Sequence, residues 1–275
     1  MSRKLPLWMR VLYYTFTGAL ILMFLAPLAW ALVSSVSPNA GTAQVDGFGF
    51  ANYARLFAYG EGIGRYLQNS LIISVLAVIA TLIATSTGGY AFARYNFKGK
   101  NFAFLLVLSV MMVPYAALLI PLIVWMKNLQ MQNSLVGVGI LLALFQLPFG
   151  TFLMRNSFSG VPKEIEEAAK IDGCSVLGAF WRVMLPSVLP AMVSVGLLTF
   201  LFAWNDFMVS LYLLSSDNAP LPLALVNMRV IGGQGALDYG ITTAGVIVLT
   251  VPAIVLFLAL QKYYVRGFTS GAVKG

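Results

Sequence analysis

The chain has 275 residues, of which 60% are hydrophobic and only 9% are charged, and its formal net charge is +8. Soluble domains carry about 25% charged residues, so this composition excludes a soluble domain and indicates a membrane protein. The basic residues are scattered beside apolar segments rather than clustered with stacking aromatics, which argues against nucleic acid as a partner. One cysteine, Cys174, excludes an internal disulfide, and without histidine neither a metal site nor histidine-based catalysis is expected. No cofactor is expected.

Six apolar segments are long enough to cross a lipid bilayer as helices, because lipid offers no hydrogen-bond partners to an open strand. The fold class predicted is therefore an all-α membrane protein with six transmembrane helices. The predicted spans are 11–33, 67–92, 102–126, 135–154, 186–214 and 240–263.

The distribution of lysine and arginine orients these spans. One face would carry 13 of the 17 basic residues, and the other would carry only Arg55, Arg65, Lys127 and Arg229. Because positive residues concentrate in cytoplasmic loops, both termini are expected in the cytoplasm, together with the loop 155–185.

The first span shares a basic start and the run Ala29-Trp30-Ala31 with cleavable signal peptides. Its apolar run, Val11 to Val33, exceeds the about 7–15 residues of a signal sequence, so an uncleaved helix is expected. Glycine and proline enrich the outer loops Ser34–Tyr66 and Ser215–Tyr239. Glycine permits sharp backbone paths that reach into a cleft, although a flexible surface connection explains the same composition.

A charged helical segment lies in the cytoplasmic loop. Pro162 suits the first position of a helix, acidic residues in the first turns oppose the positive end of the helix dipole, and Gly173 supplies a left-handed stop. Ser175 can cap a second short helix, Val176 to Leu185. The two short helices predict a compact knob beneath the bilayer.

The knob has two interpretations from its residues alone. Small Ala168 and Ala169, flanked by carboxylates and Lys170, fit a groove on a partner protein and hold its orientation by charge pairing. An amphipathic helix lying on lipid headgroups has the same composition.

The spacing of this loop has a specific parallel. Glu167-Ala168-Ala169, three residues, Gly173, nine residues, then Val183 and Leu185-Pro186 resembles the cytoplasmic signature loop of ABC importer membrane subunits, with Val183 where that family has isoleucine. The resemblance implies a coupling helix that docks into an ATPase subunit. The ATPase-coupling residues it implies are Glu166, Glu167, Ala168, Ala169, Asp172, Gly173, Leu185 and Pro186. The chain has no Gly-x-x-x-x-Gly-Lys-Ser/Thr loop, so it is not expected to be an enzyme, and partner subunits would hydrolyse ATP.

Other segments resemble the smaller membrane subunit of maltose-type sugar importers. They are Val113-Pro114-Tyr115, Gln146-Leu147-Pro148-Phe149, Ala203-Trp204-Asn205-Asp206-Phe207 and the tail Gly271 to Gly275. The resemblance implies a type I ABC importer permease-like fold in the bacterial inner (plasma) membrane. The implied partners are a second permease in a heterodimer, two ABC ATPase subunits and an external solute-binding protein.

The same resemblance implies roles for two glycine-containing segments. The tail residues Val273, Lys274 and Gly275 would contact the ATPases. The outer-loop residues Gly232, Gly233, Gln234 and Gly235 would contact the binding protein. The expected domains are 1–66, the N-terminal helix and first external loop; 67–264, a five-helix core permease domain that includes the coupling loop 155–185; and 265–275, a cytoplasmic tail.

Asp206 is the one acidic residue inside a predicted span, and ionisable groups in membranes are functional candidates. With Gln146, Trp204 and Asn205 it could line a translocation path for hydroxyl-rich solutes. Helix packing through a hydrogen bond to a neighbouring helix explains Asp206 equally well, and Gln146 is similarly ambiguous.

The function predicted is the permease subunit of an ATP-driven sugar or oligosaccharide importer. One alternative keeps the ABC assembly but changes the cargo to an amino acid, a peptide or a polyamine. An ion-coupled secondary transporter would need a buried relay and an inverted repeat, whereas the sequence shows a single membrane acid and no obvious repeat. A membrane scaffold that recruits a cytoplasmic protein through the knob is the third alternative.

Overall fold

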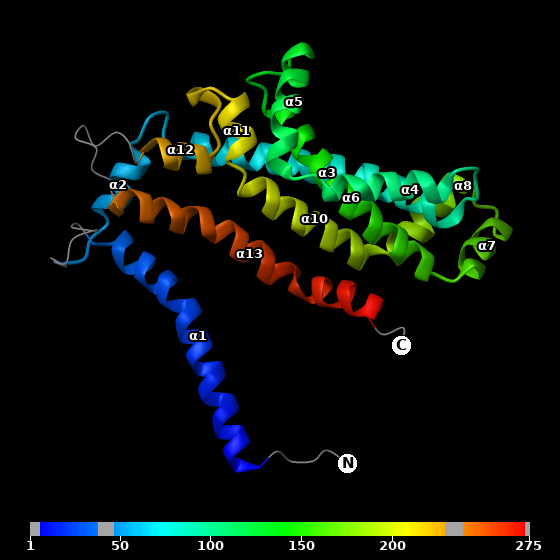
Figure 1. The fold of residues 1–275 in the computed structure, drawn as a ribbon, viewed down its shortest axis with the longest axis horizontal. Coiled ribbons are helices and arrows are strands. Elements are labelled where there is room, and N and C mark those ends of the chain that lie inside the picture. The colour runs from blue at the N-terminus through cyan, green and yellow to red at the C-terminus, as the bar shows by residue number, and fades with distance from the viewer. Residues whose placement is uncertain (1–5, 38–46, 229–238, 273–275) are drawn as a thin grey trace. The chain divides into compact units, whose positions relative to one another are not determined.

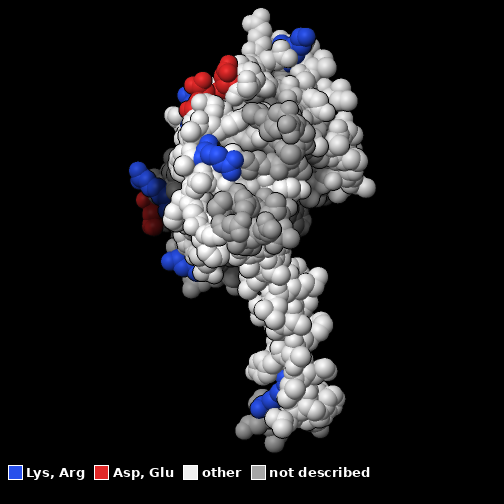
Figure 2. Space-filling view, turned by 90° about the vertical axis from the view of Figure 1, so that its left-hand side faces the viewer, with Lys and Arg blue, Asp and Glu red and all other residues white. Residues whose placement is uncertain are grey.

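The computed structural model describes residues 6–37, 47–228 and 239–272, with side chains described up to Lys262 (Figure 1). All regular secondary structure in these ranges is helical, as predicted. The chain divides into two compact units, one of residues 1–63 and 225–251 and the other of residues 64–224 and 252–275. Charged side chains are few on the face that Figure 2 shows, as the composition requires.

The first unit contains α1 (Leu7–Ser35), α2 (Ala51–Phe57) and the start of α13 (Tyr239–Ala272). α1 is a long apolar helix whose side chains are exposed along most of its length, as a lipid-facing helix requires. Asn52 fastens α2 to the end of α1, because its amide donates hydrogen bonds to the carbonyls of Ser35 (3.1 Å) and Ser37 (2.8 Å). The first turn of α13 packs on the same amide, since a Cβ at Gly240 would lie 2.5 Å from Asn52 Oδ1.

The second unit is built around α3 (Ile63–Arg94), α6 (Leu135–Gly160) and α10 (Leu189–Trp204). Glycines let α3 and α6 approach closely: a Cβ would lie 2.6 Å from Met154 Cβ at Gly89 and 2.9 Å from Leu76 Cβ at Gly139. Small residues serve this purpose in membranes, where helices associate by close packing rather than by escape from water. α6 also packs against α10.

The third predicted span is not a straight helix. α4 (Lys100–Ser109) continues into η1 (Val110–Met112), and α5 (Tyr115–Asn128) then leaves at an angle of 104°. Pro114 lacks an amide proton and forces Val113 out of the helical region, to φ −82° and ψ 125°, so the helical hydrogen bonds stop there.

The fifth predicted span is also broken. α8 (Val176–Ala179), the π-helix η2 (Phe180–Met184) and α9 (Leu185–Ser187) precede α10, with a bend of 76°. α10 ends at Trp204, and α11 (Met208–Leu213) follows after a short break. Four described helices are long and apolar enough to span a membrane, and six spans result if each bent pair counts as one. The prediction of six spans agrees with this arrangement, although two of them are not continuous helices.

The remaining elements of the second unit are α7 (Lys163–Ile171) and η3 (Ser216–Asn218), and α12 (Leu221–Met228) passes from this unit into the first. Asn133, at a left-handed φ of 52°, ties the α5–α6 turn to the segment after α11, because its Oδ1 accepts hydrogen bonds from the amide (3.0 Å) and hydroxyl (2.9 Å) of Ser215. An aromatic and aliphatic cluster fills the core at the α7 end of this unit: Tyr90, Met154, Phe158, Phe180, Met184 and Val188.

Candidate functional site

The loop 155–185 folds into two short helices as predicted, with α7 as the first. α7 begins at Lys163, one residue later than the prediction that placed Pro162 at the first helical position. Pro162 has an extended ψ of 140°, and Val161 is extended as well because a residue before proline avoids the helical region. Glu164 and Glu166 lie in the first turn and Lys170 in the last, so their charges oppose the helix dipole as predicted.

Gly173 ends α7 in the left-handed conformation that the sequence predicts, with φ +86°. The amide of Gly173 donates to the Lys170 carbonyl (3.1 Å), and that of Cys174 donates to the Ala169 carbonyl (3.0 Å). This pair of hydrogen bonds is the Schellman motif, which satisfies carbonyls left open at a helix end. The turn between α7 and α8 is therefore fixed by backbone geometry that glycine adopts without strain.

Ser175 caps the next helix as predicted, because its hydroxyl accepts a hydrogen bond from the Gly178 amide (3.1 Å). The helix predicted from Val176 to Leu185 changes character after Ala179, where the π-helix η2 begins. π-Helical segments are rare and concentrate at functional positions. The knob is thus connected to α10 through a π-helix and a bend.

Glu166 anchors the knob to the end of α3. Its carboxylate accepts hydrogen bonds from the Tyr90 hydroxyl (2.9 Å) and the Lys170 ammonium (2.8 Å), and it lies 3.4 Å from Arg94 Nε. Arg94 also donates to the Val161 carbonyl (2.8 Å) at the start of the loop. The side chains of Glu166 and Arg94 are only 9% and 7% exposed, so this is a buried ion pair.

Glu166 is one of the predicted ATPase-coupling residues, and in the structure its side chain is buried against Tyr90 and Arg94 of α3. Ala169 is buried too, Leu185 is half-buried, and Glu167, Ala168, Asp172, Gly173 and Pro186 are exposed. Sequence reasoning also missed Tyr90 and Arg94. Their spacing of four residues at the basic end of a predicted span places both on one helix face, and this is the signal that could have identified them.

Three large apolar residues of the knob are exposed. Ile171 is 86% exposed, Leu177 67% and Trp181 57%, and the acids Glu167 and Asp172 lie close to them in sequence. Large exposed apolar residues rimmed by charges mark protein interaction sites. We call the set Glu167, Ala168, Ile171, Asp172, Leu177 and Trp181 the knob face.

The electrostatics of the anchor keep Glu166 ionised. Burial alone would raise the pKa of its carboxyl, but hydrogen bonds from Lys170 and Tyr90 and the charges of Lys170 and Arg94 outweigh burial and lower that pKa below the ordinary glutamate value. The hydrogen bond to Glu166 raises the pKa of the Lys170 ammonium. Lys170 is 43% exposed, so solvent screens its share of the network.

This pKa shift predicts how stability depends on pH. Because the pKa of Glu166 is lower in the folded chain, its carboxylate contributes stability that is present above the unfolded pKa, about 4.3, and lost as pH falls through the folded pKa. The difference in unfolding free energy between wild type and Glu166→Gln should be constant from about pH 5 to pH 8 and shrink at lower pH. Thermal unfolding in detergent measures this difference, and a difference that does not change on acidification would contradict the anchor.

The structure resolves the contacts of Asp206, the candidate for the translocation path. Asp206 is buried in the break before α11. Its Oδ1 accepts a hydrogen bond from the Tyr115 hydroxyl (3.1 Å), and its Oδ2 accepts from the amide (3.0 Å) and hydroxyl (2.9 Å) of Ser210. These contacts favour the interpretation of Asp206 as a packing and helix-capping group that joins α5 to α11.

The other path candidates differ in exposure and in contacts. Trp204 is buried and stacks on Phe200 with ring centroids 5.3 Å apart, whereas Asn205 is exposed and donates to the Leu201 carbonyl (2.7 Å). Gln146 is half-buried on α6. The predicted tail residues Val273, Lys274 and Gly275 and the outer-loop residues Gly232, Gly233, Gln234 and Gly235 lie outside the described residues.

A capping role for Asp206 predicts a stability effect. Asp206→Ala should destabilise the chain by about 1–2 kcal/mol, because the start of α11 loses its cap and the Tyr115 hydroxyl loses its acceptor. Tyr115→Phe is the matched control, since it removes one of these hydrogen bonds and should cost less. Chemical denaturation measures both; an Asp206→Ala chain of wild-type stability that transports with a raised KM would favour the path interpretation instead.

The chain is similar to a known protein family and to individual members of it. Residues 81–270 match the family model of the binding-protein-dependent transport system inner membrane component. The chain is 32% identical to the arabinooligosaccharides transport system permease protein AraQ of Bacillus subtilis, covering 97% of this chain and 96% of that protein. It is 34% identical to the diacetylchitobiose uptake system permease protein DasC of Streptomyces coelicolor, covering 76% and 75%.

Solved structures share the fold. A chain of a bacterial ABC transporter involved in the import of the acidic polysaccharide alginate superposes with a TM-score of 0.82 at 22% identity, covering 96% of this chain and 100% of that one. A chain of the MetNI methionine ABC transporter gives a TM-score of 0.55 at 15% identity, covering 79% and 98%. At these identities the likeness concerns the fold alone.

Proposed function

The chain belongs to the family of inner membrane components of binding-protein-dependent transport systems, and from that premise we propose that it is the permease subunit of an ATP-driven sugar or oligosaccharide importer. It would form half of a translocation pathway together with a second permease. Two ATPase subunits in the cytoplasm and an external solute-binding protein would complete the assembly. This arrangement requires both termini in the cytoplasm, as the excess of basic residues on that face favours.

The observation that carries the proposal is a knob with an outward-facing apolar side and an inward-facing anchor. Ile171, Leu177 and Trp181 on the knob face are exposed in a loop whose other side is fastened by Glu166. Exposed apolar residues with acids close to them in sequence suit a groove on a water-soluble partner. We assign this partner as an ATPase subunit, because an ATP-driven importer needs one and the sequence of this chain contains no phosphate-binding loop.

The anchored knob also suggests how motion would be transmitted. Closure of the ATPases on ATP would displace the knob face, and the rigid Glu166 anchor would carry the displacement to the end of α3. The π-helix η2 and the 76° bend before α10 would pass it into the membrane region. The pathway would thereby alternate between inward-open and outward-open states as the ATPases shift the equilibrium.

The relatives' names support the choice of cargo. The two relatives described above are named for arabinooligosaccharides and diacetylchitobiose, and a third relative, from Rhizobium meliloti, is named for alpha-glucoside. A further relative, from Synechocystis, is named for osmoprotective compounds, with 29% identity over 99% of this chain and 95% of that protein. An ABC permease for a non-sugar solute is therefore the second candidate.

Solute uptake by cells that lack the chain tests this proposal. We expect deletion to abolish ATP-dependent uptake of at least one labelled oligosaccharide, to leave amino acid and polyamine uptake unchanged, and to be reversed by the wild-type chain. Uptake that collapses with a proton ionophore while ATP is maintained would instead indicate an ion-coupled transporter. Loss of a non-sugar solute alone would favour the second candidate.

The domain division follows from the proposed role. Residues 1–66 would form the N-terminal transmembrane helix and the first external loop, 67–264 would form the core permease domain with the coupling loop 155–185, and 265–275 would be the cytoplasmic tail. The tail residues Val273 to Gly275 would contact the ATPases, and the loop Gly232 to Gly235 would contact the binding protein.

A further inference from the structure

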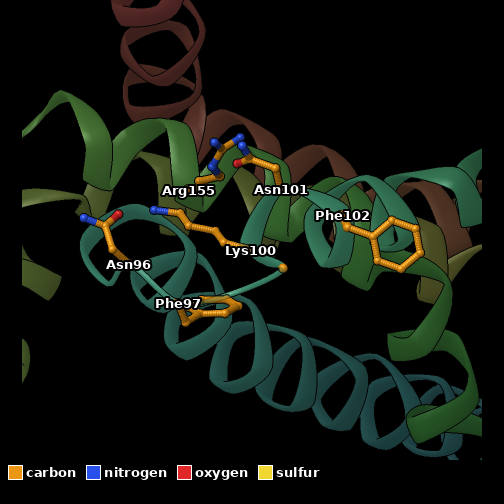
Figure 3. A pocket seen from close by; sticks show the side chains of 7 residues that line it. Asn96, Phe97, Lys100, Asn101, Phe102 and Arg155 are labelled. Atoms are coloured by element: carbon orange, nitrogen blue, oxygen red, sulfur yellow. The ribbon is translucent and has the colours of Figure 1, made fainter.

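A basic hollow lies where the α3–α4 turn meets α6 (Figure 3). Its volume is about 410 Å³. The residues that line it come from the end of the turn, the first residues of α4 and one position of α6: Asn96, Phe97, Gly99, Lys100, Asn101, Phe102 and Arg155.

The lining chemistry suits a phosphate group. Lys100 and Arg155 provide two cations and Asn96 and Asn101 provide amide donors, while none of the seven lining residues is acidic. Gly99 precedes α4 at φ +81° and has no side chain that could cap the helix, so an external acceptor can approach the amides of its first turn.

Other contacts hold both cations in position, and each cation keeps N–H groups that can donate further hydrogen bonds. The Arg155 guanidinium lies 4.0 Å from the centroid of the Phe104 ring, a cation–π contact that leaves its edge N–H groups available. Lys100 Nζ donates one hydrogen bond to the Tyr95 carbonyl (2.9 Å), and an ammonium has three protons.

The position of the hollow points to lipid. The hollow lies at the same end of this unit as the Glu166 anchor. Arg94, the last residue of α3, contacts Glu166 and the Val161 carbonyl, and Asn96 of the hollow follows Arg94 by two residues. Two exposed aromatic residues line it, Phe97 (46% exposed) and Phe102 (72%), and Tyr95 (47%) precedes the lining residues in sequence. Tyrosine concentrates at the level of lipid headgroups, and the two phenylalanine rings are apolar surface close to it in sequence.

We propose that this hollow binds the phosphate of an anionic phospholipid in the cytoplasmic leaflet, with Lys100 and Arg155 as its ligands. The assignment to that leaflet rests on the proposed function, which places the Glu166 loop in the cytoplasm. The apolar flank supplied by Phe97 and Phe102 favours a phospholipid over free phosphate, because acyl chains can lie against these rings.

Native mass spectrometry of the full-length chain, delipidated and then titrated with phosphatidylglycerol or phosphatidylcholine, tests this site. The wild type should retain phosphatidylglycerol in preference to phosphatidylcholine. Each of Lys100→Gln and Arg155→Gln should weaken phosphatidylglycerol binding about fivefold and leave phosphatidylcholine binding unchanged. Lys98→Gln is the matched control, since it removes an exposed charge from the same turn outside the hollow and should have little effect.

Three results would overturn the proposal. Equal retention of the two lipids by wild type would do so, as would an equal loss of binding in Lys98→Gln. Displacement of phosphatidylglycerol by millimolar inorganic phosphate would assign the hollow to a free anion instead. Lys100→Gln keeps Arg155 on its aromatic contact, so it remains informative if Arg155→Gln fails to fold.

The lipid measurement is independent of the importer assembly. If the same preparation retains an ATPase but shows no lipid preference, only the lipid site fails. If lipid binds selectively and no ATPase is retained, the site stands and the proposed function fails.

Discussion

Gly173→Pro is expected to reduce ATP-driven uptake at least about tenfold, because proline fixes φ near −65° whereas Gly173 requires +86°. Proline also lacks the amide that donates to the Lys170 carbonyl, and the changed turn would misplace the Cys174 amide that bonds Ala169. Interior proline costs helices about 3 kcal/mol or more, so the turn between α7 and α8 would reorganise rather than tolerate the strain. The knob face would then no longer present Ile171 and Leu177 together.

Membrane vesicles loaded with ATP and given labelled solute from the binding-protein side measure this loss. Gly173→Asn is the matched control, because asparagine tolerates the left-handed region far better than other residues with a side chain. No heavy atom outside the immediate backbone lies within 4 Å of a Cβ at Gly173, so asparagine meets no steric barrier. Normal uptake by Gly173→Pro would show that the shape of this turn is unnecessary for coupling.

Glu166→Ala is expected to destabilise the chain by about 3 kcal/mol. The change leaves the Arg94 side chain, 7% exposed, without its counter-charge, and it removes the acceptor of the Tyr90 hydroxyl. Breaking one partner of a buried ion pair is costly because the remaining charge stays buried. Denaturant unfolding followed by circular dichroism gives the free energy.

Two variants on the same helix separate anchoring from docking. Glu164→Ala removes an exposed acid and should change stability by less than about 0.5 kcal/mol. Glu167→Ala should likewise leave stability unchanged but weaken ATPase binding, because its side chain is exposed on the knob face. If Glu166→Ala were as stable as Glu164→Ala, the buried pair with Arg94 would not be what holds the loop.

The existence and number of spanning segments could be predicted from the sequence because apolar runs of this length have one stable solution in lipid. Whether these segments are straight could not be predicted, because the effect of Pro114 depends on whether neighbouring helices accept a kink or a sharp bend. Gly173 was predictable because its role is local. The capping of α8 by Ser175 was predictable for the same reason, since this cap involves residues three positions apart.

The roles of individual acidic residues could not be predicted, because they depend on partners that are distant in the sequence. Glu166 and Glu167 are adjacent and chemically alike, yet the turn of α7 directs Glu166 toward Tyr90, 76 positions earlier, and leaves Glu167 exposed. Asp206 is satisfied by Tyr115 from the bent third span, a contact that no local pattern reveals. Sequence identified the loop that carries the site but not which of its carboxylates faces inward.

Co-purification of the tagged wild-type chain beside Glu167→Lys, solubilised from native membranes and identified by mass spectrometry, tests the coupling role of the knob most directly. The account predicts that wild type brings down a second permease and a P-loop ATPase, whereas Glu167→Lys keeps the permease and loses the ATPase. A wild-type chain that purifies alone, or a Glu167→Lys chain that retains the ATPase fully, would contradict it.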